Sequence, residues 1–330
     1  MTQFDVLTIG NAIVDIIAPC EEDFLRDHDI VKGAMNLIDA ERAESLYDAM
    51  GPATEASGGS AGNTAAGLAS FGGRAAYFGK VCDDQLGKIF THDIRAVGAH
   101  FDTAPLRDEP PTARSMIFVT PDGERSMNTY LGACVELGPD DVDEGVVAGS
   151  LVTYFEGYLW DPPRAKDAIR QAAGIAHANG RRVAMTLSDS FCVERYRSEF
   201  LDLMRSGTVD IVFANEAEAR ALYETSDLES TYRAFREDCP LAIVTRSEKG
   251  SVSITREETI AVDAYPVDRV VDTTGAGDLF AAGYLHGLTR DRDPEHCARL
   301  GALAAAEVIT HMGPRPQVKL ERLARQEGLG

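Results

Sequence analysis

The sequence predicts an α/β fold in which helices pack on a central, mainly parallel β-sheet. The chain has 330 residues, of which 44% are hydrophobic and 26% are charged, and this composition is typical of a globular protein. Strand-like and helix-like segments alternate along most of the chain, as they do in βαβ units. The length allows about two domains, or one large α/β domain with an addition.

Apolar runs and the residues at their ends mark the alternating segments. The first expected strand, Phe4–Ile9, is short and apolar and ends at Gly10. An alanine-rich helix is expected over Gly62–Phe71, and proline in the first turn supports another over Pro163–His177. The other expected elements, in chain order, are the strands Leu151–Phe155, Val183–Thr186, Ile211–Ala214 and Ala242–Thr245, and the helices Arg195–Met204, Glu216–Tyr223, Asp278–Thr289 and Pro294–Ile309.

Two β-rich runs interrupt this alternation. Arg114–Val119 and Arg125–Tyr130 are separated by Thr120–Glu124, whose Pro-Asp-Gly core favours a turn, so we expect a hairpin. Ala34–Asp39 can add a further strand to it. Two interpretations remain open: the hairpin forms a small lid that excludes water from a reactive site, or it is an ordinary antiparallel edge of the main sheet.

The formal net charge of −21 excludes several classes of partner. Such a charge repels DNA and anionic membranes, so we expect neither as a partner. No apolar run reaches the roughly 18 residues that a membrane span needs, and the first residues lack the pattern of a signal peptide. The six cysteines are far apart and include no Cys-x-x-Cys pair, so we expect a reduced, cytoplasmic protein without a zinc knuckle.

The segment Asp272–Asp278 (Asp-Thr-Thr-Gly-Ala-Gly-Asp) carries the strongest chemical signal. Glycines let a ligand approach the backbone, and free N–H groups at the start of a helix bind an anion. Asp278 beside that anion suits a general base that takes a proton from an attacking nucleophile, as phosphoryl transfer needs. The alternative is a tight turn in which Asp278 faces the helix dipole, an interaction of about 0.3–1 kcal/mol. The complete heptapeptide favours the functional interpretation.

A second glycine-rich turn, Gly58-Gly59-Ser60, opens the expected helix at Gly62 and is followed by Asn63. Its glycines allow a substrate to lie against the backbone, while the hydroxyl and the amide offer partners for a polyol. The alternative is that Ser60 only caps the helix.

Asp15 follows the first expected strand, where the ligand-facing loops of α/β sheets lie. Its carboxylate can accept two hydroxyl groups of a sugar, or it can be a solvated turn residue. Arg125, just past the hairpin turn, can reach a phosphate, although a lone arginine is more often a surface charge.

Asn215 and Glu218 follow the expected strand Ile211–Ala214. Their spacing is that of a capping box at a helix start. The functional alternative is that both hold waters around a phosphate-bound Mg²⁺. The sequence contains no P-loop motif.

In their order and spacing these motifs resemble the ribokinase-type (PfkB) family of carbohydrate and nucleoside kinases, over nearly the whole chain. The resemblance implies one ribokinase-like kinase domain over residues 1–330, with a three-layer core and a small β-sheet lid from about residues 12–45 and 104–136. It also implies phosphorylation of a primary hydroxyl that depends on ATP and Mg²⁺, and a K⁺ site as in many members.

The resemblance further implies a role for each motif residue. Asp278 is then the catalytic base, and the amides of Gly275, Ala276 and Gly277 form the anion hole. The residues implied to bind the acceptor are Asn11, Asp15, Gly58, Gly59, Ser60 and Asn63. The residues implied on the nucleotide and metal side are Asn215 (ATP, and Mg²⁺ through water), Glu218 (Mg²⁺ through water), Thr245 and Gly250 (ATP, in an incomplete adenine-loop pattern with Ser247 in place of glycine), and Asp272 and Thr274 (the monovalent cation).

Within the family, the sequence is most similar to the adenosine-kinase branch, through Gly10–Asp15, Glu124–Ser126 and Phe213–Glu218. By that similarity Arg125 lies near the transferred phosphate and Met127 is a lid residue near the base. We therefore expect an ATP-dependent kinase of the 5′-hydroxyl of adenosine, acting as a monomer or homodimer. The alternatives are a kinase of ribose, fructose or a keto-sugar acid, and a non-catalytic nucleoside-binding protein.

Overall fold

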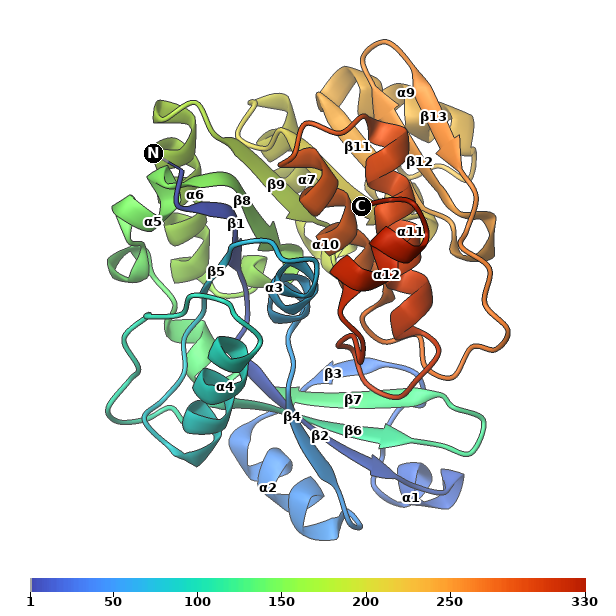
Figure 1. Ribbon diagram of the computed structural model, residues 1–330. Coiled ribbons are helices and arrows are strands. Elements are labelled where there is room, and N and C mark those ends of the chain that lie inside the picture. Colours follow the sequence, from blue (N-terminus) through green and yellow to red (C-terminus); the bar gives the residue numbers. More distant parts are fainter. Residues whose placement is uncertain (1) are drawn as a thin grey trace.

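The computed structural model describes residues 2–330, which form two β-sheets of different size (Figure 1). The strands of the larger sheet, in spatial order, are β13 (Thr259–Val262), β12 (Ser251–Thr255), β11 (Leu241–Thr245), β10 (Ile211–Asn215), β9 (Arg182–Thr186), β8 (Ser150–Glu156), β1 (Phe4–Ile9) and β5 (Ala75–Phe78). The strands of the smaller sheet are β3 (Met35–Leu37), β7 (Arg125–Tyr130), β6 (Ala113–Val119), β2 (Ile13–Pro19) and β4 (Thr54–Ser57).

The larger sheet is parallel from β11 to β5, which confirms the predicted architecture. Strand β1 lies in its interior, with Ile9 opposite Phe78 on one side and Phe155 on the other. Every residue of β1 is buried, because helices cover both faces of a parallel sheet. The antiparallel strands β12 and β13 extend one edge and were not predicted.

Helices form a layer on each face of the larger sheet. The helices of residues 2–330 are α1 (Glu22–Asp27), α2 (Ala40–Ala49), α3 (Ser60–Ser70), α4 (Gln85–Ala96), α5 (Glu144–Ala148), α6 (Pro163–Ala178), α7 (Ser190–Arg205), α8 (Glu216–Tyr223), α9 (Leu228–Asp238), α10 (Ala276–Leu288), α11 (Pro294–Val308) and α12 (Leu320–Gln326), with 3₁₀ turns at Gly132–Glu136, Pro139–Asp141, Gly157–Trp160 and Ser247–Lys249. Helices α3, α10 and α11 pack on one face and α5 to α9 on the other (Figure 1). Within residues 2–330 no helix has the length and apolarity to cross a bilayer.

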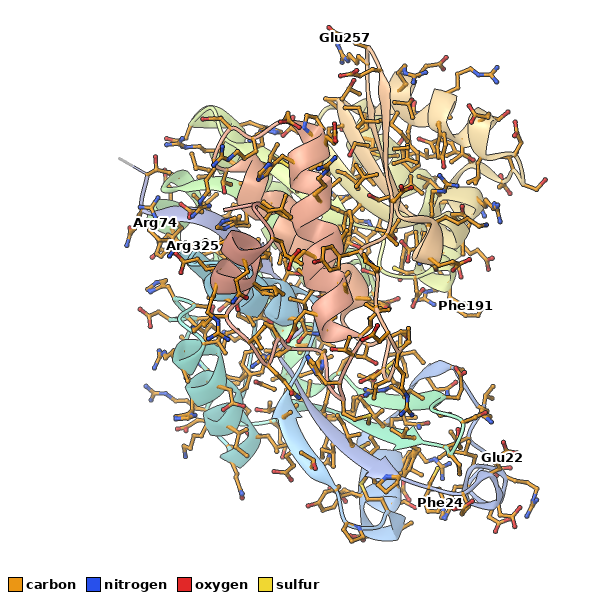
Figure 2. The ribbon with its side chains drawn as sticks, turned by 45° about the vertical axis from the view of Figure 1, so that its right-hand side comes forward. Glu22, Phe24, Arg74, Phe191, Glu257 and Arg325 are labelled. Atoms are coloured by element: carbon orange, nitrogen blue, oxygen red, sulfur yellow. The ribbon has the colours of Figure 1, made fainter. Side chains whose placement is uncertain are left out.

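The hairpin β6–β7 belongs to the smaller sheet, so the alternative that it forms an edge of the main sheet is wrong. The expected stretches 12–45 and 104–136 contain four of its five strands, and β4 lies outside both. Helices α1 and α2 close one face of this sheet over a small apolar core that includes Leu46 and Phe118. In Figure 2, Glu22 and Phe24 of α1 lie at the opposite end of the molecule from Glu257, in the turn between β12 and β13.

A glycine sets the spacing between α3 and α10. A Cβ added at Gly67 of α3 would lie 2.6 Å from the Cβ of Ala282 and 2.7 Å from Cδ1 of Leu279, both on α10. Real Cβ atoms do not come this close to other heavy atoms, so only glycine permits the observed packing. The first turns of the two helices consequently lie side by side at one edge of the larger sheet.

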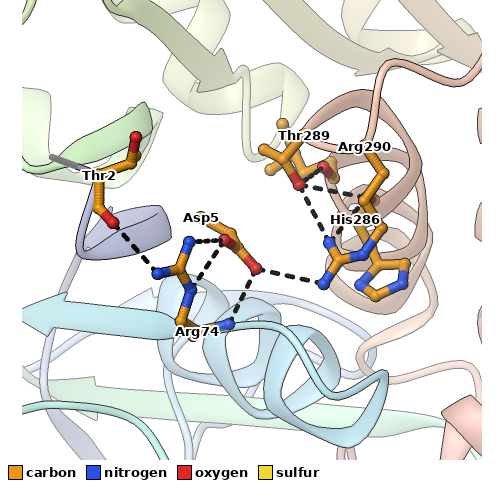
Figure 3. Close-up of polar contacts among 7 residues, drawn as sticks. Thr2, Asp5, Arg74, His286, Thr289 and Arg290 are labelled. Carbon is orange, nitrogen blue, oxygen red and sulfur yellow. Dashed lines mark hydrogen bonds and ion pairs between the residues drawn. The ribbon is translucent and has the colours of Figure 1, made fainter.

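A network of charged side chains lies at the other end of the larger sheet, where strand β1 begins (Figure 3). The Asp5 carboxylate accepts hydrogen bonds from the Arg74 side chain at 2.7 and 3.2 Å, from the Arg74 backbone N–H at 3.0 Å and from Arg290 at 3.2 Å. Burial alone would raise the pKa of Asp5, but these donors outweigh it and lower that pKa. His286, next to Arg290 in Figure 3, has its pKa lowered to about 4, mainly by burial. Through these ion pairs the network joins β1 to Arg74, just before β5, and to Arg290, just after α10.

Candidate active site

Asp278 lies in the first turn of α10, and the candidate site is built around it. Its carboxylate accepts a hydrogen bond from Ser60 Oγ at 2.6 Å and another from Asn63 Nδ2 at 3.0 Å. Both partners come from the start of α3, which the Gly67 contact brings next to α10. Burial raises the pKa of Asp278, and the two hydrogen bonds oppose this only in part. The carboxylate is therefore a stronger base than a free aspartate, and its direction is fixed.

Ser60 and Asn63 have a partner that the sequence did not predict. Both were expected to bind acceptor hydroxyls, yet both side chains are bonded to Asp278. Thr64 Oγ1 adds a hydrogen bond to the Asp278 carbonyl at 3.3 Å. Asn63 Oδ1 is buried and has no hydrogen-bond partner among residues 2–330, so the amide keeps one free acceptor beside the carboxylate. Contact of these two residues with an acceptor stays a prediction.

Gly275 forms the turn that opens α10. Its φ is +80°, and an added Cβ would lie 2.6 Å from the carbonyl oxygen of Pro314, so the position requires glycine. The N–H of Ala276 donates to the Thr273 carbonyl at 3.2 Å, which removes one of the three amides predicted for the anion hole. In the described chain, the N–H groups of Gly275 and Gly277 bond to no protein acceptor, and they lie at the positive end of α10.

Glu156, at the end of β8, is a site residue that the sequence did not reveal. Its Oε1 accepts from the backbone N–H and from Nδ2 of Asn11, at 2.9 and 2.8 Å, and its Oε2 accepts from the N–H of Ala61 at 2.9 Å. The residue is 1% exposed, and this burial raises the pKa of Glu156 to about 7. It joins the loop after β1 to the start of α3. The available signal was a carboxylate directly after the apolar run Leu151–Phe155.

The glycine pair before α3 is required by the protein's own packing. A Cβ at Gly58 would overlap the Asp15 carboxylate, and a Cβ at Gly59, whose φ is +82°, would overlap the Asn11 carbonyl. The two glycines therefore bring α3 against both predicted acceptor residues. The carboxylate of Asp15 accepts no hydrogen bond from the rest of residues 2–330.

Three charged groups act on Asp15. Burial raises the pKa of Asp15 to about 7, the charges of Arg315 and Arg125 oppose that rise, and the charge of Asp278 adds to it. Arg315 is a second residue that the sequence did not single out, because an isolated arginine has no pattern. It reaches the start of α3 from the loop between α11 and α12, with its Nη2 3.8 Å from the position of a Cβ at Gly62.

Arg125, at the start of β7, is ion-paired with Asp272, and both side chains are almost fully buried. The Asp272 carboxylate also accepts from the backbone N–H groups of Thr274 at 3.0 Å and Gly313 at 2.8 Å. A guanidinium and two amides thus donate to the carboxylate predicted for a monovalent cation, and binding of K⁺ by Asp272 and Thr274 stays a prediction. Met127 lies on the same face of β7 as Arg125 and is half-buried.

Asn215 and Glu218 form a reciprocal capping box at the start of α8. Glu218 accepts from the backbone N–H and Nδ2 of Asn215 at 2.9 and 2.6 Å, and its own N–H donates to Asn215 Oδ1 at 2.9 Å. Glu218 is 5% exposed, and burial raises the pKa of Glu218 to about 7. Because these oxygens already accept hydrogen bonds from the protein, they are better suited to bind the waters of a hydrated Mg²⁺ than to coordinate the ion directly. Over residues 2–330, no group of three or more His, Cys, Asp or Glu is arranged to hold a metal directly.

The remaining predicted nucleotide residues lie at the end of β11 and in the turn before β12. Thr245, at the end of β11, is directly opposite Asn215 in the parallel pair with β10. Gly250 has a φ of +79°, and a Cβ there would overlap the Val262 carbonyl, so the turn into β12 itself requires glycine. A hollow of about 700 Å³ beside α4 contains none of the predicted site residues, so its size does not mark the site.

Comparison with known proteins identifies the family. The pfkB family carbohydrate kinase profile matches residues 5–320. The chain belongs to this family. The crystal structure of adenosine kinase from Sinorhizobium meliloti has 70% sequence identity, covers 99% of this chain and 100% of that chain, and superposes with a TM-score of 0.95. That of a probable sugar kinase from Rhizobium etli CFN 42 has 65% identity, covers 100% of both chains and has a TM-score of 0.97. Among curated proteins, adenosine kinase from Saccharomyces cerevisiae is 26% identical over 94% of this chain and 96% of its own length.

Membership of the pfkB family confirms the resemblance that the motifs suggested, together with the ribokinase-like fold. As a pfkB kinase the protein is a phosphotransferase that uses an alcohol group as acceptor. The fold brings the predicted residues to the edge at which the parallel strands end, which is where α/β sheets bind ligands.

Proposed function

We propose that this protein is an ATP-dependent kinase that transfers the γ-phosphate to the 5′-hydroxyl of adenosine. The observation that carries the proposal is the Asp278 carboxylate, which Ser60 and Asn63 hold beside the free amides of the glycine turn. A fixed carboxylate of raised pKa next to unpaired N–H donors provides what phosphoryl transfer needs, a base and a cradle for negative charge.

In the proposed mechanism Asp278 accepts the proton of the 5′-hydroxyl as that oxygen attacks the γ-phosphorus, while the bond from this phosphorus to the β–γ bridging oxygen breaks and ADP leaves. The N–H groups of Gly275 and Gly277 and the positive end of α10 stabilise the charge on the phosphoryl oxygens. Mg²⁺, held through its waters by Asn215 and Glu218, supplies charge neutralisation between the phosphates when bound. The smaller sheet acts as a lid that excludes water, and its Arg125 reaches the transferred phosphate when it leaves Asp272.

Two observations support adenosine as the acceptor. The relative from Sinorhizobium meliloti at 70% identity is an adenosine kinase. The predicted lid also presents the apolar side chain of Met127, which suits a purine better than a bare sugar. A sugar acceptor is the second candidate, because the relative from Rhizobium etli CFN 42 at 65% identity is a probable sugar kinase. Adenosine and sugars are both neutral polyols, so Asp15 and Asn11 suit either.

A substrate panel tests the proposal. ADP release is measured with ATP and Mg²⁺ for adenosine, D-ribose and D-fructose, and the phosphorylated product is identified by mass spectrometry. We expect kcat/KM for adenosine to exceed that for either sugar by at least about 100-fold, and 5′-AMP as the product. Turnover of a free sugar with none of adenosine contradicts the choice of acceptor. Calorimetric binding of adenosine without any ADP release supports a non-catalytic binding protein instead.

A further inference from the structure

The segment after α11 is held against the glycine turn of the site. The N–H of Gly313 donates to the Asp272 carboxylate at 2.8 Å, and Pro314 packs on Gly275, with its Cα 2.8 Å from the position of an added Cβ. Arg315 follows and lies between two prolines, Pro314 and Pro316, which restrict the backbone on both sides. The turn that opens α10 therefore also fixes where Arg315 enters the site.

The guanidinium of Arg315 has unused hydrogen-bonding capacity. Its Nε and Nη2 are buried and have no hydrogen-bond partner among residues 2–330. Its Nη2 lies 3.8 Å from the position of a Cβ at Gly62, in the first turns of α3. A guanidinium stays charged in proteins, and a buried charge without partners is unfavourable. Buried guanidinium nitrogens without a protein partner are expected where a bound ligand accepts their hydrogen bonds.

The negative or titratable groups whose charges act on Arg315 come from β2, α4 and β5: Asp15, Asp93 and Tyr77. Asp93 already accepts from Ser57 Oγ at 3.0 Å and lies 3.2 Å from a ring nitrogen of its neighbour His92. The Tyr77 hydroxyl donates to the Gly10 carbonyl at 2.9 Å. Within residues 2–330, Asp15 alone of the three makes no hydrogen bond through its side chain.

Asp15 and Arg315 therefore form an incomplete pair. Asp15 lies against Gly58, just before α3, and Arg315 lies near Gly62, in the first turns of α3, yet within the described chain the two side chains form no ion pair. A hydroxyl group can fill such a gap, because its oxygen accepts from the guanidinium while its hydrogen is donated to the carboxylate. Two adjacent hydroxyls can use both carboxylate oxygens and two guanidinium N–H groups.

We propose that Arg315 is an acceptor-binding residue that, together with Asp15, binds the vicinal 2′,3′-diol of the ribose. The inference rests on the proposed function and names the group of the acceptor that the pair recognises. The carboxylates of Asp15, Glu156 and Asp278 each contact the segment 58–63 at the start of α3, so an anionic acceptor would be repelled there and a neutral diol fits.

The test compares adenosine with 2′,3′-dideoxyadenosine, which keeps the 5′-hydroxyl and lacks the diol. Hydrogen bonds to charged groups contribute about 1.5–3 kcal/mol each, so we expect Arg315→Met to lower kcat/KM for adenosine about 10- to 150-fold, mostly through KM. For the dideoxy compound the same variant should lose less than about threefold. Equal losses on both compounds, or a fall in kcat alone, would overturn the proposal.

Two further variants separate recognition from folding. Arg322→Met makes the same substitution at an exposed arginine of α12 and should leave kcat/KM unchanged for both adenosine and 2′,3′-dideoxyadenosine. Arg315→Lys keeps the charge but not the forked donors, and it should show the same dependence on the diol with a smaller loss. If Arg315→Met does not fold, as judged by circular dichroism, the test uses Arg315→Lys alone. An equal loss of kcat/KM on adenosine and on the dideoxy compound in that variant would contradict the proposal.

The same experiment distinguishes a failure of the proposed function. Wild-type protein that does not phosphorylate adenosine contradicts that function, and the comparison is then made with D-ribose and 2-deoxy-D-ribose. If neither pair is turned over, calorimetric dissociation constants for adenosine and its dideoxy analogue replace kcat/KM. Wild-type protein that binds both members of a pair equally well overturns the role of Arg315.

Discussion

Arg125 and Asp272 form a buried ion pair that joins the hairpin of the smaller sheet to the turn before α10. One residue belongs to the predicted lid and the other to the motif that contains the proposed base, and 147 positions of sequence separate them. The pair links the smaller sheet to the motif at the start of α10. In the proposed mechanism, the phosphate of a nucleotide competes with Asp272 for the Arg125 guanidinium of the predicted lid.

Breaking this pair should destabilise the protein strongly. Removing one partner of a buried pair costs about 3–5 kcal/mol, because the other charge stays buried without compensation. We expect Arg125→Met and Asp272→Asn each to lower the free energy of unfolding in urea, and the double variant to lose less than the sum of the two. The exposed pair of Arg26 and Asp23 provides the control, since Arg26→Met should change stability by no more than about 1 kcal/mol. Additive losses would show that the two residues are not coupled.

Asp278→Asn should separate binding from chemistry. Asparagine keeps the shape and one acceptor oxygen but cannot take a proton, so kcat should fall about 100- to 10,000-fold, while KM for both substrates stays within about threefold. Steady-state kinetics on adenosine and ATP measure this, and a thermal melt checks that the variant folds. A kcat within tenfold of the wild type would remove Asp278 from the role of base.

A substitution at Gly277 should affect stability and activity in opposite directions. It lies inside α10 without a positive φ, and an added Cβ meets no heavy atom within 4 Å. Gly277→Ala should therefore stabilise the fold by about 0.5–1 kcal/mol, yet raise KM for ATP or lower kcat at least tenfold, because the methyl group enters the space proposed for the phosphate. Thermal melts and kinetics together test this.

Gly174→Ala is the matched control for that variant. Gly174 is exposed on α6, and an added Cβ there also meets nothing within 4 Å. It should give the same gain in stability with unchanged activity. Full activity in Gly277→Ala would place the phosphate elsewhere. By contrast, Gly275→Ala should lose stability, since its φ is +80° and Pro314 blocks the side chain.

Glu218 should make stability depend on pH in a predictable direction. Burial raises its pKa from the ordinary 4.5 to about 7, so the folded state holds a proton more tightly than the unfolded state does. The contribution of Glu218 to the free energy of unfolding is then fully present below about pH 4.5 and is lost as the pH rises through 7. We expect the free energy of unfolding of the wild type, minus that of Glu218→Gln, to fall between pH 4.5 and 7.5. Urea unfolding at four pH values measures it, and a constant or rising difference would contradict the assignment.

The parallel sheet was predictable because its evidence is local. Phe4–Ile9 and the later core strands are mostly apolar runs, and β9 and β10 are each followed by a helix with a recognisable start. Two strands of the smaller sheet lack such a signal. In Thr54–Ser57 only the last residue is buried. Ile13–Pro19 begins just after β1, without a turn motif between the two strands. Both strands depend on partners distant in sequence.

The candidate site was predictable in its motifs and not in its contacts. The glycines around Asp278 identify an anion turn, but the bond from Ser60 Oγ joins residues 218 positions apart and depends on how α3 and α10 pack. Glu156 and Arg315 are single charged residues without a repeating pattern, so only the fold shows that they reach the site. The capping box of Asn215 was one of two readings of its spacing, and the structure contains it.

The contact of Gly67 with Ala282 and Leu279 has a consequence for how the enzyme can change over evolution. A single methyl group at that buried position would force the two helices apart and withdraw Ser60 and Asn63 from Asp278. If Asp278 is the base, as proposed, catalysis depends on a buried residue that does not contact the substrate. Substitutions that alter turnover should therefore arise deep in the helix layer as well as around the bound reactants.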